Sequence, residues 1–310
     1  MQKTQETDVR RDEHMILCDN LVKIYKTKDI EVLALQGLEL VVDRGELMAI
    51  VGNSGSGKST FLNMIGGIDR PSAGRLIVDG KDLFKLNDAE LVKYKRETVG
   101  FMWQNNARNL LPWLPAWQNV ETPMLFGTEK ERRRRAYDLL DLIGMGHRKH
   151  SRLSQLSGGE QQRIAIAIAL ANNPKILLAD EPTGSVDRKT ADYILDVFRR
   201  LNREFGLTVV MVTHDREIAG KVNRCVTIRD GKVASERLLP GELLAKMNEL
   251  GGLAEGESPQ GHEEFAILDR AGRLQIPREM LDELGVSTNK VRLAMETGEN
   301  GEKRIVIGRD

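Results

Sequence analysis

The sequence has little cysteine, no net charge and no long apolar run. Its 310 residues include only Cys18 and Cys225, too few for a disulfide framework or a cysteine metal cluster, as is typical of a reducing compartment. Basic and acidic residues number 46 each, so no global charge attracts nucleic acid or anionic lipid. No apolar stretch approaches the roughly 20 residues of a membrane-spanning helix, so another chain would have to supply any span.

Short apolar runs of strand length begin at Met15. Residues 47–51 are apolar on both faces and lead directly into a glycine-rich turn, the strand–loop–helix order of a nucleotide-binding α/β core. We therefore predict an α/β P-loop NTPase fold. The expected strands are residues 15–18, 38–42, 47–51, 76–78, 176–179, 209–212 and 226–228.

Composition divides the chain into four parts. Residues 1–14 are polar and are expected to form a disordered tail rather than a signal peptide. A core over residues 15–250 is expected to carry an inserted helical subdomain at about 87–156, with a helix over 129–143. Residues 251–261 have linker composition, and 262–310 form a small β-rich unit.

A phosphate-binding loop follows the strand at residues 47–51. The pattern G-x-x-x-x-G-K-[ST] lets backbone N–H groups surround phosphate oxygens at the start of a helix. Lys58 is expected to reach the β- and γ-phosphates, and Ser59 to bind Mg²⁺. The nucleotide-binding residues of this stretch are Asn53, Ser54, Gly55, Ser56, Gly57, Lys58, Ser59 and Thr60.

An apolar strand at residues 176–179 ends in two carboxylates. Asp180 is placed to hold Mg²⁺, and Glu181 to polarise the water that attacks ATP. An acidic turn after a strand is the alternative, but a phosphate loop in the same chain favours the catalytic interpretation.

Ser157 begins a helix with a capping-box pattern that Glu160 completes. Such a helix start with two glycines, Gly158 and Gly159, is also an anion site. It is either an ordinary helix start or a second phosphate-binding site. One chain has no second nucleotide to place at such a site.

These motifs together resemble the nucleotide-binding subunit of ABC transporters, over about residues 15–244. The resemblance implies that two subunits sandwich two ATP molecules, so that Ser157 and Gly159 contact the γ-phosphate of the partner's ATP. A second copy of the chain is therefore the first expected partner, and ATP and Mg²⁺ are the expected cofactors.

Four further positions take their roles from the resemblance. Tyr25 matches the aromatic that stacks on adenine, although packing is the commoner role of a strand tyrosine. Gln104 matches the glutamine that senses Mg²⁺ and the attacking water. Asp187 lies in the loop that crosses the dimer interface, and His214 matches the switch histidine at the γ-phosphate.

Residues 109–113 and 180–184 are more closely similar to the MacB/LolD-type branch, which handles macrolides, peptides or lipoproteins through a permease. Val186, Trp103 and Ile168 depart from its usual Leu, Phe and Arg. The resemblance implies a cytoplasmic subunit, peripheral on the inner face of the cell membrane, that contacts the membrane only through the permease.

Apolar side chains crowd the loop between Asn105 and Met124. Such patches mark partner sites, so this loop is expected to dock the permease, the alternative being that it covers the helical subdomain. The basic run at residues 132–135 spreads around a helix and is expected to be a solvated surface rather than a contact with lipid phosphates. The crowded residues are Leu110, Leu111, Trp113, Leu114 and Trp117.

Residues 268–279 resemble the swapped-hairpin domain of AbrB/MazE-type regulators, an interlocked dimer that often binds DNA. Residues 262–310 contain eight Lys or Arg against ten Asp or Glu, a formal charge of −2, whereas DNA binding needs a positive face. We therefore expect dimerisation and no nucleic acid. Strands are expected at 265–268, 273–276, 290–295 and 303–307, and a helix near 277–284.

Three functions stay open from the sequence. The first is an ATPase subunit of a transporter, and the second is an ATPase that transmits force or a signal across a membrane without transport. A soluble ABC ATPase ranks last, because such proteins usually fuse two cassettes or carry long coiled coils.

Overall fold

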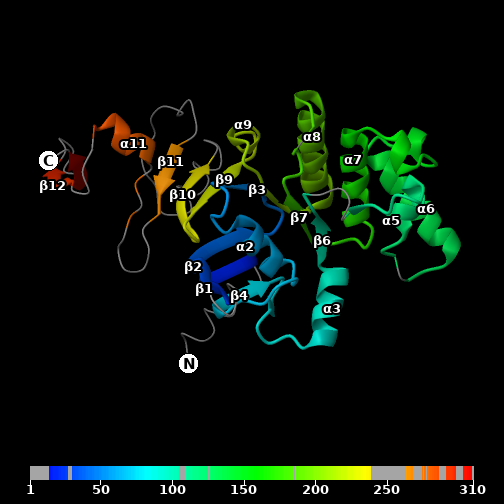
Figure 1. The fold of residues 1–310 in the computed structure, drawn as a ribbon, viewed down its shortest axis with the longest axis horizontal. Helices are drawn as coiled ribbons and strands as arrows, with labels where there is room; N and C mark the ends of the chain where they lie inside the picture. Colours follow the sequence, from blue (N-terminus) through cyan, green and yellow to red (C-terminus); the bar gives the residue numbers. More distant parts are fainter. Residues whose placement is uncertain are drawn as a thin grey trace.

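The computed structural model describes residues 14–26, 30–104, 109–124, 126–184, 186–238, 263–267, 274, 276, 278–285, 291–297 and 303–308. The fold is mixed α/β, as predicted, with a mostly parallel central sheet and a smaller antiparallel sheet (Figure 1). In the part of the chain described, no helix is long and apolar enough to cross a membrane. Of the tail expected at 1–14, residues 1–13 lie outside the described residues and His14 begins β1; the linker expected at 251–261 also lies outside them.

The central sheet has the order β11-β10-β9-β3-β8-β7-β6. The five strands from β9 to β6 are parallel to one another. Their carboxyl ends therefore lie on one side of the sheet, where ligands bind in α/β folds. Every residue of β3, β7 and β8 is buried, as the continuous apolar runs predicted. The parallel strands are β3 (Leu47–Val51), β6 (Val99–Met102), β7 (Ile176–Asp180), β8 (Thr208–Val212) and β9 (Arg224–Arg229).

The antiparallel sheet has the order β2-β1-β4-β5. Helix α2 (Lys58–Ile65) joins it to the central sheet, because Phe61 and Leu62 share one buried cluster with Ile16 of β1 and Ile50 of β3. Packing of α2 in this cluster holds the phosphate loop, which leads into the helix, against the core. The strands are β1 (His14–Lys26), β2 (Glu31–Asp43), β4 (Ala73–Val78) and β5 (Lys81–Asp82).

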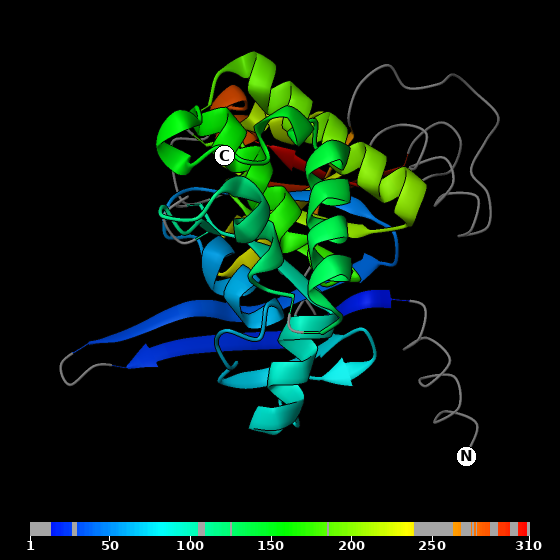
Figure 2. The same ribbon diagram turned by 90° about the vertical axis from the view of Figure 1, so that its right-hand side faces the viewer.

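Helices cover the other face of the central sheet around a second buried cluster (Figure 2). The helix expected over 129–143 is confirmed as α6, with its predicted apolar face buried. The helices of this layer are α5 (Ala116–Glu121), α6 (Glu129–Leu142), α7 (Gly158–Ala169), α8 (Arg188–Phe205) and α9 (Arg216–Ala219), with 3-10 turns at Gly146–Arg148 and Leu153–Gln155.

The structure differs from the expectation of a helical subdomain starting at residue 87. Strand β6 pairs in parallel with β7 and is part of the central sheet. Helix α3 (Asp88–Glu97) packs on the nucleotide-binding core through Tyr94, which is 1% exposed and donates a hydrogen bond to the carbonyl of Ile65. A charged helix with a single buried aromatic and a four-residue strand give too weak a periodic signal to place them in the core.

The basic run at residues 132–135 is not simply a solvated surface. Arg135 donates to the carbonyl oxygens of Leu170 and Ala171, and the guanidinium of Arg133 lies 4.4 Å from the ring centre of Trp117. Arg132 pairs with Glu121. These contacts fasten α6 to its neighbours, and the helical wheel could not reveal them because the partners lie far away in the sequence.

The C-terminal part divides between two sheets. β11 (Glu263–Ala266) pairs antiparallel with β10 (Lys232–Leu238) at the edge of the central sheet, instead of standing apart with the following residues. β12 (Arg292–Thr297) and β13 (Lys303–Gly308) form a separate two-stranded sheet, with α11 (Arg278–Glu283) before it. Two of the four residues of the strand expected at 273–276 lie outside the described residues, and a domain over 262–310 stays a prediction.

Candidate functional site

The phosphate loop connects the end of β3 to the start of α2. Close packing requires two of its glycines: a Cβ atom on Gly52 would lie 2.2 Å from the carbonyl oxygen of Ile228, and one on Gly57 would lie 2.6 Å from that of Ala34. Gly57 also has a positive φ of 103°, which favours glycine. The backbone therefore curls tightly at the positive end of α2, where an anion binds.

Lys58 is held at the mouth of this loop. Its Nζ atom donates to the carbonyl oxygens of Gly52 and Asn53, at 2.8 Å each. Burial lowers the pKa of Lys58, although the charges of Glu181 and Asp180 oppose the shift. A buried ammonium bound to carbonyl oxygens favours the arrival of an anion, so this side chain fits the expected phosphate contact.

Ser59 and Asp180 meet at the end of β7. The Ser59 hydroxyl donates to Oδ1 of Asp180 at 3.3 Å. Burial raises the pKa of Asp180, and the charge of Glu181 adds to the effect, while the Ser59 hydrogen bond opposes it. These oxygens suit Mg²⁺, which takes one or two protein ligands and completes its shell with water and phosphate oxygens. The described residues hold no group of three or more His, Cys, Asp or Glu side chains that could bind a metal.

Glu181 is held in an unusual backbone conformation. Its φ is +50°, a left-handed value that is uncommon outside glycine, and its N–H donates to the carbonyl oxygen of Val212 at 2.9 Å. Oε2 lies 2.9 Å from Nδ1 of His214, which follows β8. Non-glycine residues in this conformation cluster at functional sites, since the surrounding structure must hold them there.

One cavity of about 490 Å³ brings most of the predicted site together, a size that suits a nucleotide. Gln104 is exposed on its wall, as expected from its position after β6. The cavity is lined by Tyr25, Val32, Leu33, Ala34, Gly52, Ser54, Gly55, Gly57, Lys58, Ser59, Thr60, Gln104, Glu181 and His214.

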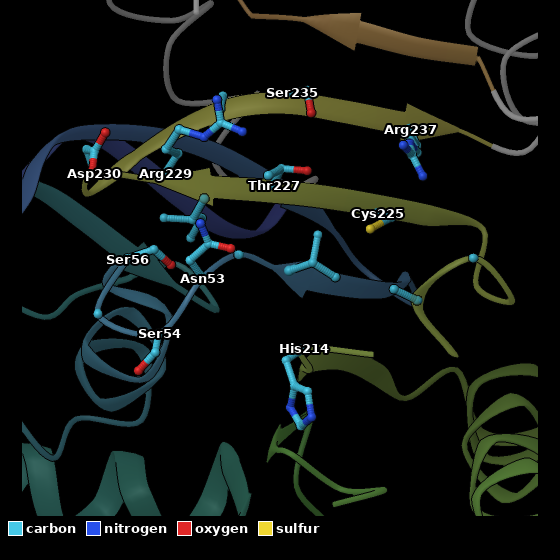
Figure 3. A pocket seen from close by; sticks show the side chains of 17 residues that line it. Asn53, Ser54, Ser56, His214, Cys225, Thr227, Arg229, Asp230, Ser235 and Arg237 are labelled. Carbon is cyan, nitrogen blue, oxygen red and sulfur yellow. The ribbon is translucent and has the colours of Figure 1, made fainter. Parts of the chain in front are cut away.

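A second cavity of about 500 Å³ adjoins the first, since Gly52, Ser54, Gly55 and His214 line both. Figure 3 shows Asn53 and Ser56 of the loop on its wall, below polar side chains of β9 and β10. These strand residues were not predicted from the sequence. Their only signal in the sequence is the spacing of two positions within each strand, which puts both side chains on one face: Thr227 and Arg229, and Ser235 and Arg237.

The capping box at Ser157 is confirmed. Its hydroxyl accepts from the N–H of Glu160 at 3.3 Å, and the Glu160 carboxylate accepts from the N–H of Ser157 at 2.8 Å, which lowers the Glu160 pKa. Ser157 and Gly158 are exposed, and a Cβ atom on Gly158 would touch nothing within 4 Å. None of the residues 157–160 lines the phosphate-loop cavity, so nucleotide contacts by these four residues stay a prediction.

Asp187 caps the N-terminus of α8. Its carboxylate accepts from the N–H of Thr190 at 3.0 Å and from the Thr190 hydroxyl at 2.7 Å. It does not line the phosphate-loop cavity, and Ser185 lies outside the described residues. A contact of Asp187 across a dimer interface therefore also stays a prediction.

Known proteins similar to this chain agree with a nucleotide-binding site of this geometry. Residues 35–184 match the family described as ABC transporter. An uncharacterised ABC transporter ATP-binding protein of Thermotoga maritima is 47% identical over 68% of this chain and 90% of its own length, and YvrO of Bacillus subtilis, also uncharacterised, is 46% identical over 71% and 95%.

Two solved structures of similar proteins belong to larger assemblies. The dimeric ATP-binding cassette MJ0796, bound to ADP and phosphate, is 42% identical and superposes with a TM-score of 0.66, covering 72% of this chain and 97% of that one. CbiO1 of Clostridium perfringens, part of the transporter complex cbiONQ, is 28% identical with a TM-score of 0.67, covering 77% and 93%. The chain belongs to the ATP-binding proteins of ABC transporters, and it is an ATPase that uses ATP with Mg²⁺.

Proposed function

We propose that this ATPase energises a separate membrane permease of the MacB/LolD type, for export or extraction of a drug, peptide, lipid or lipoprotein. The observation that carries its ATPase part, a site shared by two copies, is that the site in one copy is incomplete. Lys58, Ser59 and Glu181 line one cavity, and Asp180 accepts a hydrogen bond from Ser59 beside it, but the exposed, capped helix start at Ser157 contributes nothing to that cavity. A second copy would supply the missing anion site.

In this mechanism the loop N–H groups and Lys58 bind the phosphates of ATP. Ser59 and Asp180 would hold Mg²⁺, which neutralises charge on the phosphate oxygens when bound. Glu181 accepts a proton from the attacking water, and His214 holds the Glu181 carboxylate by the 2.9 Å contact at Nδ1. Gln104 lies on the cavity wall, where its amide would contact the water or Mg²⁺ when they are bound.

A mixed-subunit experiment tests the paired site. Lys58→Ala damages the phosphate loop of a copy, and Ser157→Arg blocks the helix start that it offers to its partner, so each variant alone is inactive. In a mixed dimer both lesions fall in one site and the other site is intact. Mixing should restore roughly a quarter of wild-type activity, because about half of random dimers are mixed and each has one intact site. No recovery despite mixed dimers, or full activity of Ser157→Arg alone, would contradict the proposal.

The permease would dock on the loop that ends in α5. Trp113 is 67% exposed there, while the amide of Asn119 holds the loop by donating to the carbonyl oxygens of Leu111, Leu114 and Pro115. A rigid loop that presents one large apolar side chain fits a partner site. Leu110 and Trp117, by contrast, are buried and cover the helical layer. The membrane protein that co-purifies with the chain would identify the permease and show whether the complex transports or transmits force.

We further propose that the C-terminal part pairs two copies. The two-stranded sheet of β12 and β13 exposes Leu293, Met295 and Ile305 by 67%, 72% and 73%. An isolated hairpin with an open apolar face is marginally stable, and a second copy would cover it. Two tethered cassettes would then have a raised effective concentration for each other.

A further inference from the structure

The ring of Tyr25 is held by a carboxylate on a different element. Tyr25 lies near the end of β1, 39% exposed on the wall of the phosphate-loop cavity. Its hydroxyl donates to Oδ2 of Asp69 at 2.8 Å. A tyrosine ring has only two side-chain torsions, so anchoring the hydroxyl restricts the whole ring.

Asp69 is itself fixed, and by the helix that starts at the phosphate loop. It follows α2 in the turn over residues 66–70, where the N–H groups of Ile68 and Asp69 both donate to the carbonyl oxygen of Asn63, at 2.9 and 3.2 Å. One end of α2 thus carries Lys58, and the other end positions Asp69. The distance between the phosphate loop and the Tyr25 ring is set by this one rigid helix.

Lys23 completes the arrangement from the same strand as Tyr25. It is only 8% exposed, and its Nζ donates to Oδ1 of Asp69 at 2.6 Å and to the carbonyl oxygen of Arg70 at 2.8 Å. The ammonium lies 4.7 Å from the centre of the Tyr25 ring, within the range of a cation–π contact. A lysine is rarely buried unless paired, so the Lys23–Asp69 pair needs both members.

The charge of Asp69 is stabilised by these contacts. Burial alone would raise its pKa, but the hydrogen bonds from Lys23 and Tyr25 outweigh burial and lower it. Asp69 is therefore a carboxylate at neutral pH, with one oxygen for Lys23 and the other for Tyr25. Oδ1 accepts from Lys23 and Oδ2 accepts from Tyr25, so the carboxylate links the two side chains.

We propose that Asp69 and Lys23 are positioning residues that hold the Tyr25 ring in place for the purine base of the nucleotide. The inference rests on the proposed stacking role of Tyr25. A ring fixed before binding loses less conformational freedom when the base stacks on it, so affinity rises without a new contact to the nucleotide.

Competitive inhibition of ATP hydrolysis by ADP and by inorganic tripolyphosphate, which has no base, tests the proposal on the full chain. Asp69→Ala and Tyr25→Phe, which keeps the ring, should each raise the inhibition constant of ADP by about threefold to tenfold. This is the effect of losing one ordinary hydrogen bond. Tripolyphosphate should bind as before. Asp69→Asn keeps a side-chain oxygen for the phenol and should lose less than Asp69→Ala.

A double substitution separates positioning from a structural role. Tyr25→Ala should weaken ADP by roughly tenfold or more, the usual worth of a stacked base. Adding Asp69→Ala to it should change ADP affinity by less than about twofold, because the residues act through one contact. Lys23→Met removes the other partner of Asp69 and should also lower ADP affinity without changing tripolyphosphate affinity. Lys26→Met, which removes the exposed pair with Glu31 on the same hairpin, is its control.

The outcomes are distinguishable. The positioning role would be overturned if Asp69→Ala lowered the affinities for tripolyphosphate and ADP equally. It would also be overturned if the two losses of ADP affinity multiplied in the double variant. If Tyr25→Ala weakens ADP but Tyr25→Phe and Asp69→Ala do not, only this inference is wrong. If Tyr25→Ala itself leaves ADP affinity as in the wild type, the stacking role within the proposed function is wrong as well.

Discussion

Nδ1 of His214 lies 2.9 Å from Oε2 of Glu181, although the two residues follow different strands of the central sheet. Glu181 is 8% exposed, whereas the His214 side chain is 76% exposed and lines the nucleotide cavity. The contact joins a buried carboxylate to a residue that can face ATP.

Replacement of this carboxylate gives the first prediction. Glu181→Gln should lose hydrolysis by about two to four orders of magnitude, since a general base is removed, while ATP binding persists. ATP should then trap a closed dimer, which size-exclusion chromatography would detect. Glu204→Gln, on the exposed side of α8, is the control. Substantial remaining turnover would remove Glu181 from the role of base.

Trp113, in the loop before α5, and Trp117, within α5, should respond oppositely. Trp117 is 8% exposed and packs against Tyr137, so Trp117→Ala should destabilise the fold by about 3 kcal/mol. Trp113→Ala should change stability by less than about 0.5 kcal/mol. It should instead weaken stimulation of the ATPase by the permease. Thermal unfolding of both variants is the measurement, and equal losses would contradict the assignment.

Asp79 should stabilise the protein only above acidic pH. Its side chain is 5% exposed; burial would raise its pKa, but hydrogen bonds from Lys175 and Arg44 outweigh burial and lower it. A lowered pKa means that the stabilisation is present above the unfolded-state value and is lost as pH falls through the folded-state value. Asp79→Asn should cost about 2 kcal/mol at pH 7, as expected for hydrogen bonds to a charged group.

The pH dependence of the free energy of unfolding checks this prediction. The difference between wild type and Asp79→Asn should shrink as the pH is lowered below about 4, the ordinary range of an aspartate. Asp88→Asn, whose side chain is 98% exposed in its pair with Arg70, is the control. A pH-independent difference would show that Asp79 acts by packing alone.

A buried triad ties β9 to its two neighbours in the sheet, β10 and the start of β3. Arg224 is 8% exposed and pairs with Glu46 at 2.9 Å and Glu236 at 2.7 Å. Arg224→Met leaves two partly buried carboxylates without their cation and should cost about 3 kcal/mol in urea unfolding. Arg188→Met, which breaks an exposed pair with Glu217, should cost less than about 1 kcal/mol. Similar costs for both would contradict the triad's role.

Two truncations separate the C-terminal elements. Removal of residues 268–310 keeps β11 on the sheet, whereas removal of 251–310 also exposes the edge of β10. Both should weaken the cooperativity of ATP hydrolysis and leave nucleotide binding, and only the longer should promote aggregation through the open edge. Unchanged ATP-dependent pairing in both proteins would exclude a pairing role for this part.

Much of the nucleotide core could be predicted because its signals are local. The apolar runs at β3 and β7, the glycine pattern of the phosphate loop and the capping box at Ser157 each depend on residues close in the sequence. The same holds for α6, whose apolar face has a clear helical period. Family resemblance then supplied roles for single positions such as Gln104 and His214, which carry no local pattern.

By itself the sequence determined the strands, the phosphate loop and the helix starts, because backbone geometry and periodicity act within a few residues. Only the tertiary structure decided that β6 and Tyr94 belong to the nucleotide core, that β11 extends its sheet, and that Lys23 and Asp69 hold Tyr25. The Lys23–Asp69 contact spans 46 positions of the chain. Such pairings depend on how whole elements pack, and hydrophobic periodicity does not say which polar residue on one element will meet which on another.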